Sequence, residues 1–298
     1  MVAAITSAEV GLHRRVVVNG VGLHFVESGH GPPVVLLHGF PEFWYSWRHQ
    51  IPALADAGYR AVAPDLRGYN ESDKPPGVKN YHPELLVADV AGLIEHLDAG
   101  PAVVVGHDWG GIIAWLLVMR RPDLVRGVVA MNAPHPATFL HEVRHARQYL
   151  RSWYVLFFQL PWFPEAAMRF TNFGFLSHAL RRQPVHPDAF TWEDVRRYKE
   201  AIAKPGALTA ALNYYRAAFR YQRELTRGFR AVRGPALVIW GERDAYLTTH
   251  VLDGMPAWAP DARMMRIPDA SHWVQNDLPG VVNQALIDFL RSIEPSGG

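Results

Sequence analysis

Cysteine is absent from the 298 residues of this chain. Its absence excludes disulfide bridges, a thiol nucleophile and metal sites that need thiolate ligands. The sequence also lacks an apolar run long enough to cross a bilayer, so no membrane partner is expected. Neither sign of charge dominates, since the formal net charge is +2 and charged residues make up 19%. Nucleic acid is therefore not expected as a partner either.

The N-terminal segment MVAAITSAEVGLHRR has no basic start, and Ser and Glu interrupt its apolar run. We therefore expect no signal peptide, and the default location is the cytoplasm. Hydrophobic residues make up 49%, which is enough to fill the core of a folded domain. Basic residues are scattered, as in HEVRHARQYLR and EDVRRYKE, and we interpret them as solvated helix faces. Oligomeric state is left open, with a homodimer as one option.

Strand-like and helix-like segments alternate in the first 134 residues. Residues 16–18 and 23–28 predict a strand pair, and the buried runs PPVVLLHG, YRAVAPDLRG, PAVVVGHD and VRGVVAMNAP predict four more strands. Helices are expected in SWRHQIPALADAG, which would close at Gly58, in HPELLVADVAGLIEHLD and in GGIIAWLLVMRR. This alternation predicts an α/β fold with a mostly parallel sheet and helices on both faces.

The pattern changes after Pro136. Residues 137–230 are rich in Trp, Tyr, Phe and Arg, with helical stretches and no buried strand. Strand signals return at 235–244 and 262–272, both interpreted as buried strands, and VVNQALIDFLRSI predicts a final helix. We therefore predict a core formed by residues 1–136 and 231–298 and an inserted helical lid over 137–230.

The segment VVVGHDWGG, residues 103–111, is the most informative part of the sequence. A strand runs into Gly106-His107-Asp108-Trp109-Gly110 and straight into a helix, which is the nucleophile-elbow pattern with Asp in place of Ser. Glycines flank the nucleophile because the chain passes close by in a strained turn. The start of a helix behind it favours an anion. Asp108 is therefore predicted as a carboxylate nucleophile rather than as a simple helix cap.

Two further side chains complete the expected site. Asp244 follows one predicted strand and His272 follows the next, which gives the chain order nucleophile, acid, histidine of α/β-hydrolases. Parallel strands bring such positions together at the carboxyl edge of the sheet. Phe40 follows the strand at 33–37, so we assign the oxyanion hole to the backbone N–H groups of Phe40 and Trp109. The Phe40–Pro41 bond is a candidate for the cis form.

Together the segments HGFPEFWYSWRHQIP, DLRGYNESDKP, GHDWGG, GERDAYL and DASHWVQNDLP resemble the epoxide hydrolase branch of the α/β-hydrolase family. The resemblance covers nearly the whole chain. It implies the α/β-hydrolase fold with an eight-stranded sheet, and a small apolar epoxide as the substrate. Water would be added to give a vicinal diol through an ester on Asp108, which water activated by His272 and Asp244 would hydrolyse. The scheme needs no metal ion and no organic cofactor.

The resemblance also points to two tyrosines in the lid. Epoxide hydrolases carry one in a Tyr-x-x-x-Phe-Gln segment and one in an Asn-x-Tyr-Arg segment, and this chain has YVLFFQ at 154–159 and NYYR at 213–216. Tyr154 and Tyr215 match, and are implied as the donors to the epoxide oxygen. Spacing alone does not select them, because buried tyrosines are common in helical caps.

Several other residues receive simpler interpretations. Trp44, Trp273 and Pro41 are expected to line an apolar substrate pocket, as ligand sites usually are apolar. Asp65 is expected to organise the loop in PDLRGYNESDKP, and His38 to be structural. His135, at the junction of core and lid, is left without a role.

Three alternatives remain. A haloalkane dehalogenase would share the Asp nucleophile and could use the Trp109 indole for the halide, but Phe40 offers no second halide donor. Fluoroacetate dehalogenases bind the carboxylate of their substrate with Arg side chains beside the nucleophile elbow, where this chain has Trp109 and Ile112. A non-catalytic ligand-binding module on the same fold would not need nucleophile, acid and base together.

Overall fold

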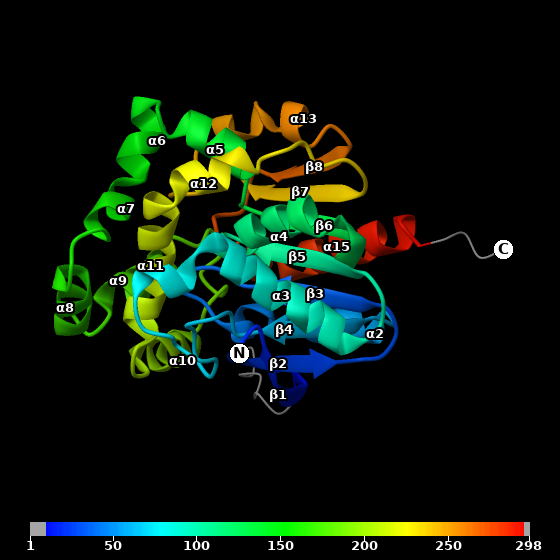
Figure 1. Cartoon of the computed structure of the whole chain (residues 1–298), viewed down its shortest axis with the longest axis horizontal. Coiled ribbons are helices and arrows are strands. Elements are labelled where there is room, and N and C mark those ends of the chain that lie inside the picture. Colours follow the sequence, from blue (N-terminus) through cyan, green and yellow to red (C-terminus); the bar gives the residue numbers. More distant parts are fainter. Residues whose placement is uncertain (1–9, 295–298) are drawn as a thin grey trace.

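An eight-stranded sheet runs through residues 10–294, the part of the chain that the computed structural model describes (Figure 1). Its strand order is β1-β2-β4-β3-β5-β6-β7-β8. β1 pairs antiparallel with β2 and β2 with β4, whereas all other neighbours are parallel, which confirms the predicted mostly parallel sheet. The strands are β1 (Leu12–Val18), β2 (Val21–Ser28), β3 (Pro33–Leu37), β4 (Arg60–Pro64), β5 (Ala102–His107), β6 (Val125–Met131), β7 (Ala236–Gly241) and β8 (Ala262–Ile267).

Helices cover both faces of the sheet. α3 (Pro83–Leu97) and α4 (Trp109–Arg120) pack against each other on one face, in front in Figure 1, and α2 (Gln50–Asp56) and α15 (Pro279–Ser292) pack together behind it. The helix expected from Ser46 is divided, because η1 (Trp44–Trp47) forms a separate 3₁₀ turn before α2 begins. Gly58 follows α2 with a φ of +92°, a conformation that glycine adopts freely at the end of a helix.

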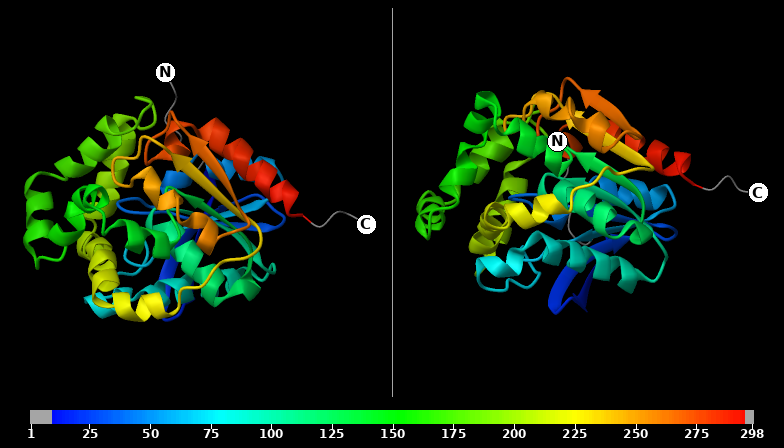
Figure 2. Two further views of the ribbon diagram at one scale, coloured as in Figure 1. Left: turned by 90° about the horizontal axis from the view of Figure 1, so that it is seen from above. Right: turned by 45° about the horizontal axis from the view of Figure 1, so that its top comes forward.

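Between β6 and β7 the described chain forms helices and no strand, as predicted. In Figure 2 the green helices of this segment extend to one side of the sheet. The predicted boundaries of the inserted helical lid, at residues 137 and 230, stay a prediction. The helices are α5 (Pro136–Glu142), α6 (Ala146–Arg151), α7 (Trp153–Phe157), α8 (Phe163–Phe170), α9 (Gly174–Arg182), α10 (Trp192–Ala203), α11 (Ala207–Arg220) and α12 (Gln222–Arg227).

Short helical turns join the remaining elements, and the last strands differ in burial. β7 is buried along its whole length, but β8 is the edge strand and most of its side chains are partly or fully exposed. The expectation of a second buried strand before His272 is therefore wrong, since β8 has a neighbour on one side only. The turns are η2 (Val78–Tyr81), η3 (Pro122–Leu124), η4 (Thr249–Leu252), α13 (Met255–Trp258) and α14 (Val274–Asp277).

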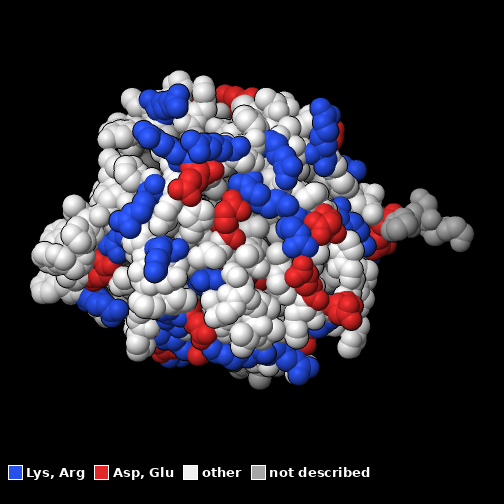
Figure 3. All heavy atoms as spheres, viewed as in Figure 1, with Lys and Arg blue, Asp and Glu red and all other residues white. Residues whose placement is uncertain are grey.

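Charged side chains of both signs share the face shown in Figure 3. Among the described residues, no helix combines the length and the apolar composition needed to cross a bilayer. Residues 1–9, which belong to the segment for which no signal peptide is expected, lie outside the described residues.

Candidate active site

Asp108 stands in a tight turn between the end of β5 and the start of α4. Its φ of +51° lies in the left-handed region, which is strained for a residue with a side chain. The turn depends on close backbone packing, since a Cβ atom at Gly110 would lie 2.0 Å from the carbonyl oxygen of Leu37. A Cβ atom at Gly39 would lie 2.4 Å from the Asp108 side chain. The glycines therefore allow β3, the elbow and α4 to meet at one point.

Two backbone amides face the Asp108 carboxylate. The Phe40 N–H donates to Oδ1 at 2.8 Å, and the Trp109 N–H also donates to the carboxylate. Burial raises the pKa of Asp108, while the positive charges of His272 and His107 and these two amides oppose the rise. The two amides lie where the oxyanion hole is predicted, and the Phe40–Pro41 bond is cis, as expected.

His272 and Asp244 form a hydrogen-bonded pair beside the nucleophile. The His272 Nδ1–H donates to Asp244 Oδ2 at 2.7 Å, and His272 Nε2 lies 3.8 Å from Asp108 Oδ2. Asp244 also accepts from the backbone N–H groups of Tyr246 and Leu247 at 2.7 and 2.9 Å, and from the Asn132 side chain at 2.7 Å. These donors fix the carboxylate, and with it the orientation of the imidazole.

Electrostatics strongly favour the protonated form of His272. Burial alone would lower its pKa, but the charge and hydrogen bond of Asp244 and the charge of Asp108 together raise the pKa to about 9. The pKa of Asp244 is lowered, because the charge and hydrogen bond of His272 outweigh its burial. In the free protein at neutral pH, His272 therefore carries a proton beside the Asp108 carboxyl group.

A second buried pair lies beneath the site. His107 Nδ1 lies 2.7 Å from Glu42 Oε2, and His107 Nε2 lies 2.8 Å from the backbone carbonyl oxygen of His272. Each ring nitrogen of His107 therefore has an oxygen partner, one on the Glu42 side chain and one on the His272 backbone. Glu42 also accepts from Ser46 and from the Gly39 N–H. The pair therefore links the loop after β3 to the backbone of His272.

Tyr154 on α7 and Tyr215 on α11 face the same cavity as Asp108 and His272. Their ring centroids lie 5.9 Å apart. Burial, followed by the charge of Asp108, raises the pKa of both phenols well above the usual value, so both remain protonated donors at neutral pH. The Trp109 ring lies edge-on to the Tyr215 ring, with the ring centroids 5.1 Å apart.

Arg216 joins the two segments that carry these tyrosines. It donates from α11 to the backbone carbonyl oxygens of Phe158 and Leu160, each at 2.8 Å, just beyond α7. It also forms an ion pair with Glu165 at 2.7 Å. These contacts hold the end of α7 against α11, the two helices that carry Tyr154 and Tyr215.

The cavity has a volume of about 510 Å³ and is mainly apolar. The lid and the core both contribute, and its apolar lining includes Ile112, Phe139, Val143, Leu156, Phe219 and Phe229. The expectation that Trp44, Trp273 and Pro41 line the substrate pocket is wrong for this cavity, since none of the three belongs to its lining. Trp44 packs against Phe43 and Tyr45, and Trp273 packs against Phe190 and His107, so both indoles belong to the core.

Three residues near the site have structural roles. Asp65 accepts from His24, the Trp44 N–H and Asn70, and so organises the loop after β4 as expected. His38 accepts from the Leu66 N–H through Nε2, in agreement with the structural role proposed for it. His135 caps α5 by accepting from the Ala137 N–H.

The sequence interpretation missed several residues of the site, among them Asn132, Tyr246, Arg216, Glu42 and His107. Tyr246 packs its ring against His272 with centroids 5.0 Å apart and donates its hydroxyl to Gln183. Glu42 and His107 stand inside segments already singled out, HGFPEFW and GHDWGG, but nothing in the sequence pairs them. Asn132 directly follows β6 and so lies at the same edge of the sheet as Asp108, Asp244 and His272. Its position after a strand is the one sequence signal that could have marked it as a residue of the site.

Comparisons with known proteins agree with this geometry. Residues 32–277 match the family model of the alpha/beta hydrolase fold. The chain is 42% identical to AB hydrolase superfamily protein YfhM of Bacillus subtilis (strain 168), over 92% of this chain and 96% of that protein. It is 36% identical to Epoxide hydrolase 4 of Homo sapiens, over 97% of this chain and 82% of that protein. A crystal structure of a variant epoxide hydrolase from Bacillus megaterium superposes with a TM-score of 0.86 at 34% identity, covering 93% of this chain and 100% of that one.

Proposed function

The chain belongs to the epoxide hydrolase branch of the α/β-hydrolase fold family, and we propose that it converts an epoxide to a vicinal diol through an ester formed on Asp108. One observation carries the proposed mechanism. A single apolar cavity holds the Asp108 carboxylate, the His272 imidazole and the two phenols of Tyr154 and Tyr215. A carboxylate nucleophile and acids for an oxygen leaving group are therefore present in the same cavity.

In the first step, a carboxylate oxygen of Asp108 attacks one carbon of the epoxide ring. Oδ1 is held by the Phe40 amide, so Oδ2 is the oxygen free to attack. The carbon–oxygen bond of the ring breaks as the ester bond forms, and the released oxygen takes a proton from Tyr154 or Tyr215. A serine would leave an ether at this point, whereas a carboxylate leaves an ester, which water can hydrolyse.

In the second step, His272 acts as a base. Ester formation removes the negative charge of Asp108, which is one of the causes that raise the pKa of His272. The proton affinity of His272 therefore falls at the moment when a base is needed. The proton that His272 releases balances the phenolate left by the first step, which returns to its phenol form. Neutral His272 then takes a proton from water, and the hydroxide attacks the ester carbonyl.

The oxyanion formed in that attack lies against the amides of Phe40 and Trp109. An amide donor of this kind is typically worth about 3–4 kcal/mol of barrier. Collapse of the oxyanion breaks the bond to the diol oxygen, which takes the proton that His272 had removed from water. The carboxyl proton left on Asp108 then passes to His272, so the diol is released and the Asp108 carboxylate is restored opposite a protonated His272. Asp244 stabilises the imidazolium form of His272 whenever the ring holds the additional proton.

Halide release fits the cavity less well. The Trp109 ring packs edge-on against the Tyr215 ring, with the ring centroids 5.1 Å apart. Phe40, at the position of a second halide donor, packs its ring against Phe158, Phe175 and Tyr215. The cavity therefore offers phenols for an oxygen leaving group and no matched pair of halide donors.

The decisive experiment traps the ester. His272→Gln keeps the hydrogen-bonding side chain but removes the base, so incubation with styrene oxide is expected to leave a stable adduct on Asp108, visible by mass spectrometry. Diol formation by the unaltered chain is measured beside halide release from a haloalkane. In heavy-oxygen water, a single turnover is expected to put the label into the Asp108 carboxylate. A label found only in the diol would mean direct attack by water and would refute the ester mechanism.

The substrate class follows from the lining of the cavity, which fits a small apolar epoxide. A cytoplasmic location, the capacity to form a homodimer and the absence of nucleic-acid and membrane partners stay predictions.

A further inference from the structure

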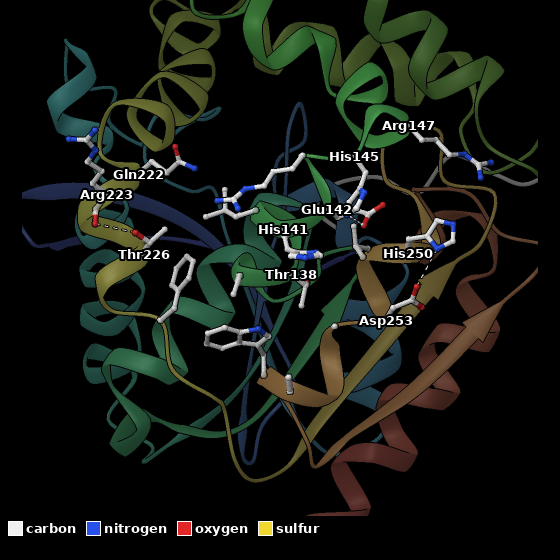
Figure 4. A pocket seen from close by; sticks show the side chains of 18 residues that line it. Thr138, His141, Glu142, His145, Arg147, Gln222, Arg223, Thr226, His250 and Asp253 are labelled. Carbon is white, nitrogen blue, oxygen red and sulfur yellow. Dashed lines mark hydrogen bonds and ion pairs between the residues drawn. The ribbon is translucent and has the colours of Figure 1, made fainter.

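A second cavity, an outer groove of about 1210 Å³, lies beside the lid. Its walls come from α5, α12 and residues 250–258 (Figure 4). The groove does not include the proposed nucleophile, base or phenols, but it shares four lining residues with the catalytic cavity: Leu140, Arg144, Gln222 and Phe229. The two cavities are therefore neighbours separated by a thin wall.

We propose that His141, Glu142 and His145, in this groove, bind a divalent transition-metal ion of the Zn²⁺ type. One ligand atom from each of the three side chains lies within 4.8 Å of the other two. Figure 4 shows the three side chains close together at the end of α5. Two imidazoles and one carboxylate are a donor set that Zn²⁺ commonly takes in proteins, with water in the fourth position.

The sequence His141-Glu142-Val143-Arg144-His145 has the spacing His-Glu-x-x-His. In a continuous helix, that spacing places two histidines on one face and leaves the glutamate as a base. Here α5 ends at Glu142 and His145 stands just before α6. The chain turns between the histidines and brings the Glu142 carboxylate among the ligand atoms, so Glu142 would serve here as a ligand and not as a base.

Glu142 supplies the strongest physical reason for a cation. Its side chain is only 11% exposed. In the described part of the chain its one ion pair is with His145 at 3.9 Å, and its one hydrogen bond comes from Thr248 at 3.3 Å. A nearly buried carboxylate usually has closer partners than these, or coordinates a metal ion. A cation between Glu142 and the two imidazoles would supply the missing compensation.

Arginines in the same groove oppose a cation and limit the expected affinity. Arg144, Arg147 and Arg223 belong to its lining, against the carboxylates of Glu142 and Asp253. Figure 4 shows the Arg147 guanidinium directed away from the three ligands, and Asp253 hydrogen-bonded to His250. We therefore expect weaker binding than at a site of the same three ligands without competing positive charge.

Metal binding at this position would act on the catalytic cavity through the turn between α5 and α6. Val143 and Arg144 lie between the ligands in sequence and line the catalytic cavity. An ion bound by residues 141, 142 and 145 would restrict the movement of this turn. It would therefore also restrict the positions of Val143 and Arg144, which line the catalytic cavity.

Isothermal titration calorimetry with ZnCl₂ tests the site, using the full chain without a polyhistidine tag after treatment with a chelator. One equivalent of Zn²⁺ is expected to bind. His141→Ala, His145→Ala and Glu142→Gln are each expected to weaken binding by at least about tenfold, since even partners outside the coordination shell contribute 10–100-fold. His96→Ala is the matched control, because His96 is exposed on α3, outside the groove, and its removal should change nothing.

Thermal unfolding gives a second readout. Zn²⁺ is expected to raise the melting temperature of the unaltered chain and not that of the His141→Ala, His145→Ala double variant, since a ligand stabilises only the state that binds it. Circular dichroism verifies that each variant is folded. The proposal is overturned if the unaltered chain binds no Zn²⁺, or if the three variants bind it as tightly as the His96→Ala control.

Discussion

The proton affinity of His272 should depend on the charge of Asp108. Asp108→Asn removes that charge while keeping the shape of the side chain and an oxygen that can accept from the Phe40 amide. The two groups are 3.8 Å apart, between His272 Nε2 and Asp108 Oδ2. At an effective dielectric constant of about 20, opposite unit charges at that distance interact by about 4 kcal/mol. Since every 1.36 kcal/mol is a factor of ten, the proton affinity would fall by roughly a thousandfold.

Solvent reduces this value, because the Asp108 side chain is 20% exposed at the cavity. Doubling the dielectric constant halves the interaction to about 2 kcal/mol, or roughly thirtyfold in proton affinity. The pKa of His272, which is raised to about 9 in the unaltered chain, is therefore expected to fall toward the ordinary range of histidine. The direction follows from charge alone, because a lost anion always favours the neutral imidazole.

Nitrogen-15 NMR of the imidazole rings measures this change directly. A pH titration of the unaltered chain and of Asp108→Asn follows the His272 resonance, which is identified by its absence in His272→Gln. Asp123→Asn is the control, because that carboxylate is exposed and pairs with Arg121. If His272 titrates at the same pH with and without the Asp108 charge, ester formation cannot release the base, and the proposed second step is refuted.

Three further results are expected. Burial would raise the pKa of Glu42, but its ion pair and hydrogen bond with His107 and the hydrogen bonds from Ser46 and Gly39 lower the pKa to about 2. Glu42→Gln should therefore lower the free energy of unfolding by about 3 kcal/mol at pH 7. Urea denaturation should show this difference shrinking as the pH falls from about 4.5 to about 2. Gly110→Ala should prevent or severely weaken folding, whereas Gly280→Ala, where a Cβ meets nothing within 4 Å, should be nearly neutral in the same assay. Tyr154→Phe and Tyr215→Phe should each slow ester formation by about 10²-fold or more in stopped-flow experiments, while a preformed ester is still hydrolysed. Equal rates of ester formation in both variants and in the unaltered chain would exclude the phenols as acids.

The core of the site could be predicted from sequence because its signals are local. A strand, a glycine-flanked acid and a helix are contiguous at Asp108, and Asp244 and His272 each follow a strand of the same sheet. Chain order and the parallel sheet were then enough to bring them together. Tyr154 and Tyr215 were different, since only the family resemblance selected them among the aromatic residues of the lid.

The substrate pocket could not be predicted in the same way. Trp44 and Trp273 lie next to site residues in sequence, but the direction of their side chains depends on packing partners far along the chain, such as Phe190 for Trp273. Glu42 and His107 are 65 residues apart, and their pairing depends on how the loop after β3 meets the end of β5. Long-range packing of this kind leaves no periodic pattern in the sequence.

The contacts of Arg216 with the end of α7 have a consequence for any opening movement of the lid. Because this guanidinium binds two carbonyl oxygens and Glu165, it ties the two tyrosine-bearing segments to each other. The lid could swing away to admit a substrate without separating the two hydroxyl groups. The acid pair would then be assembled before the substrate arrives, and closure would only have to bring it down over Asp108.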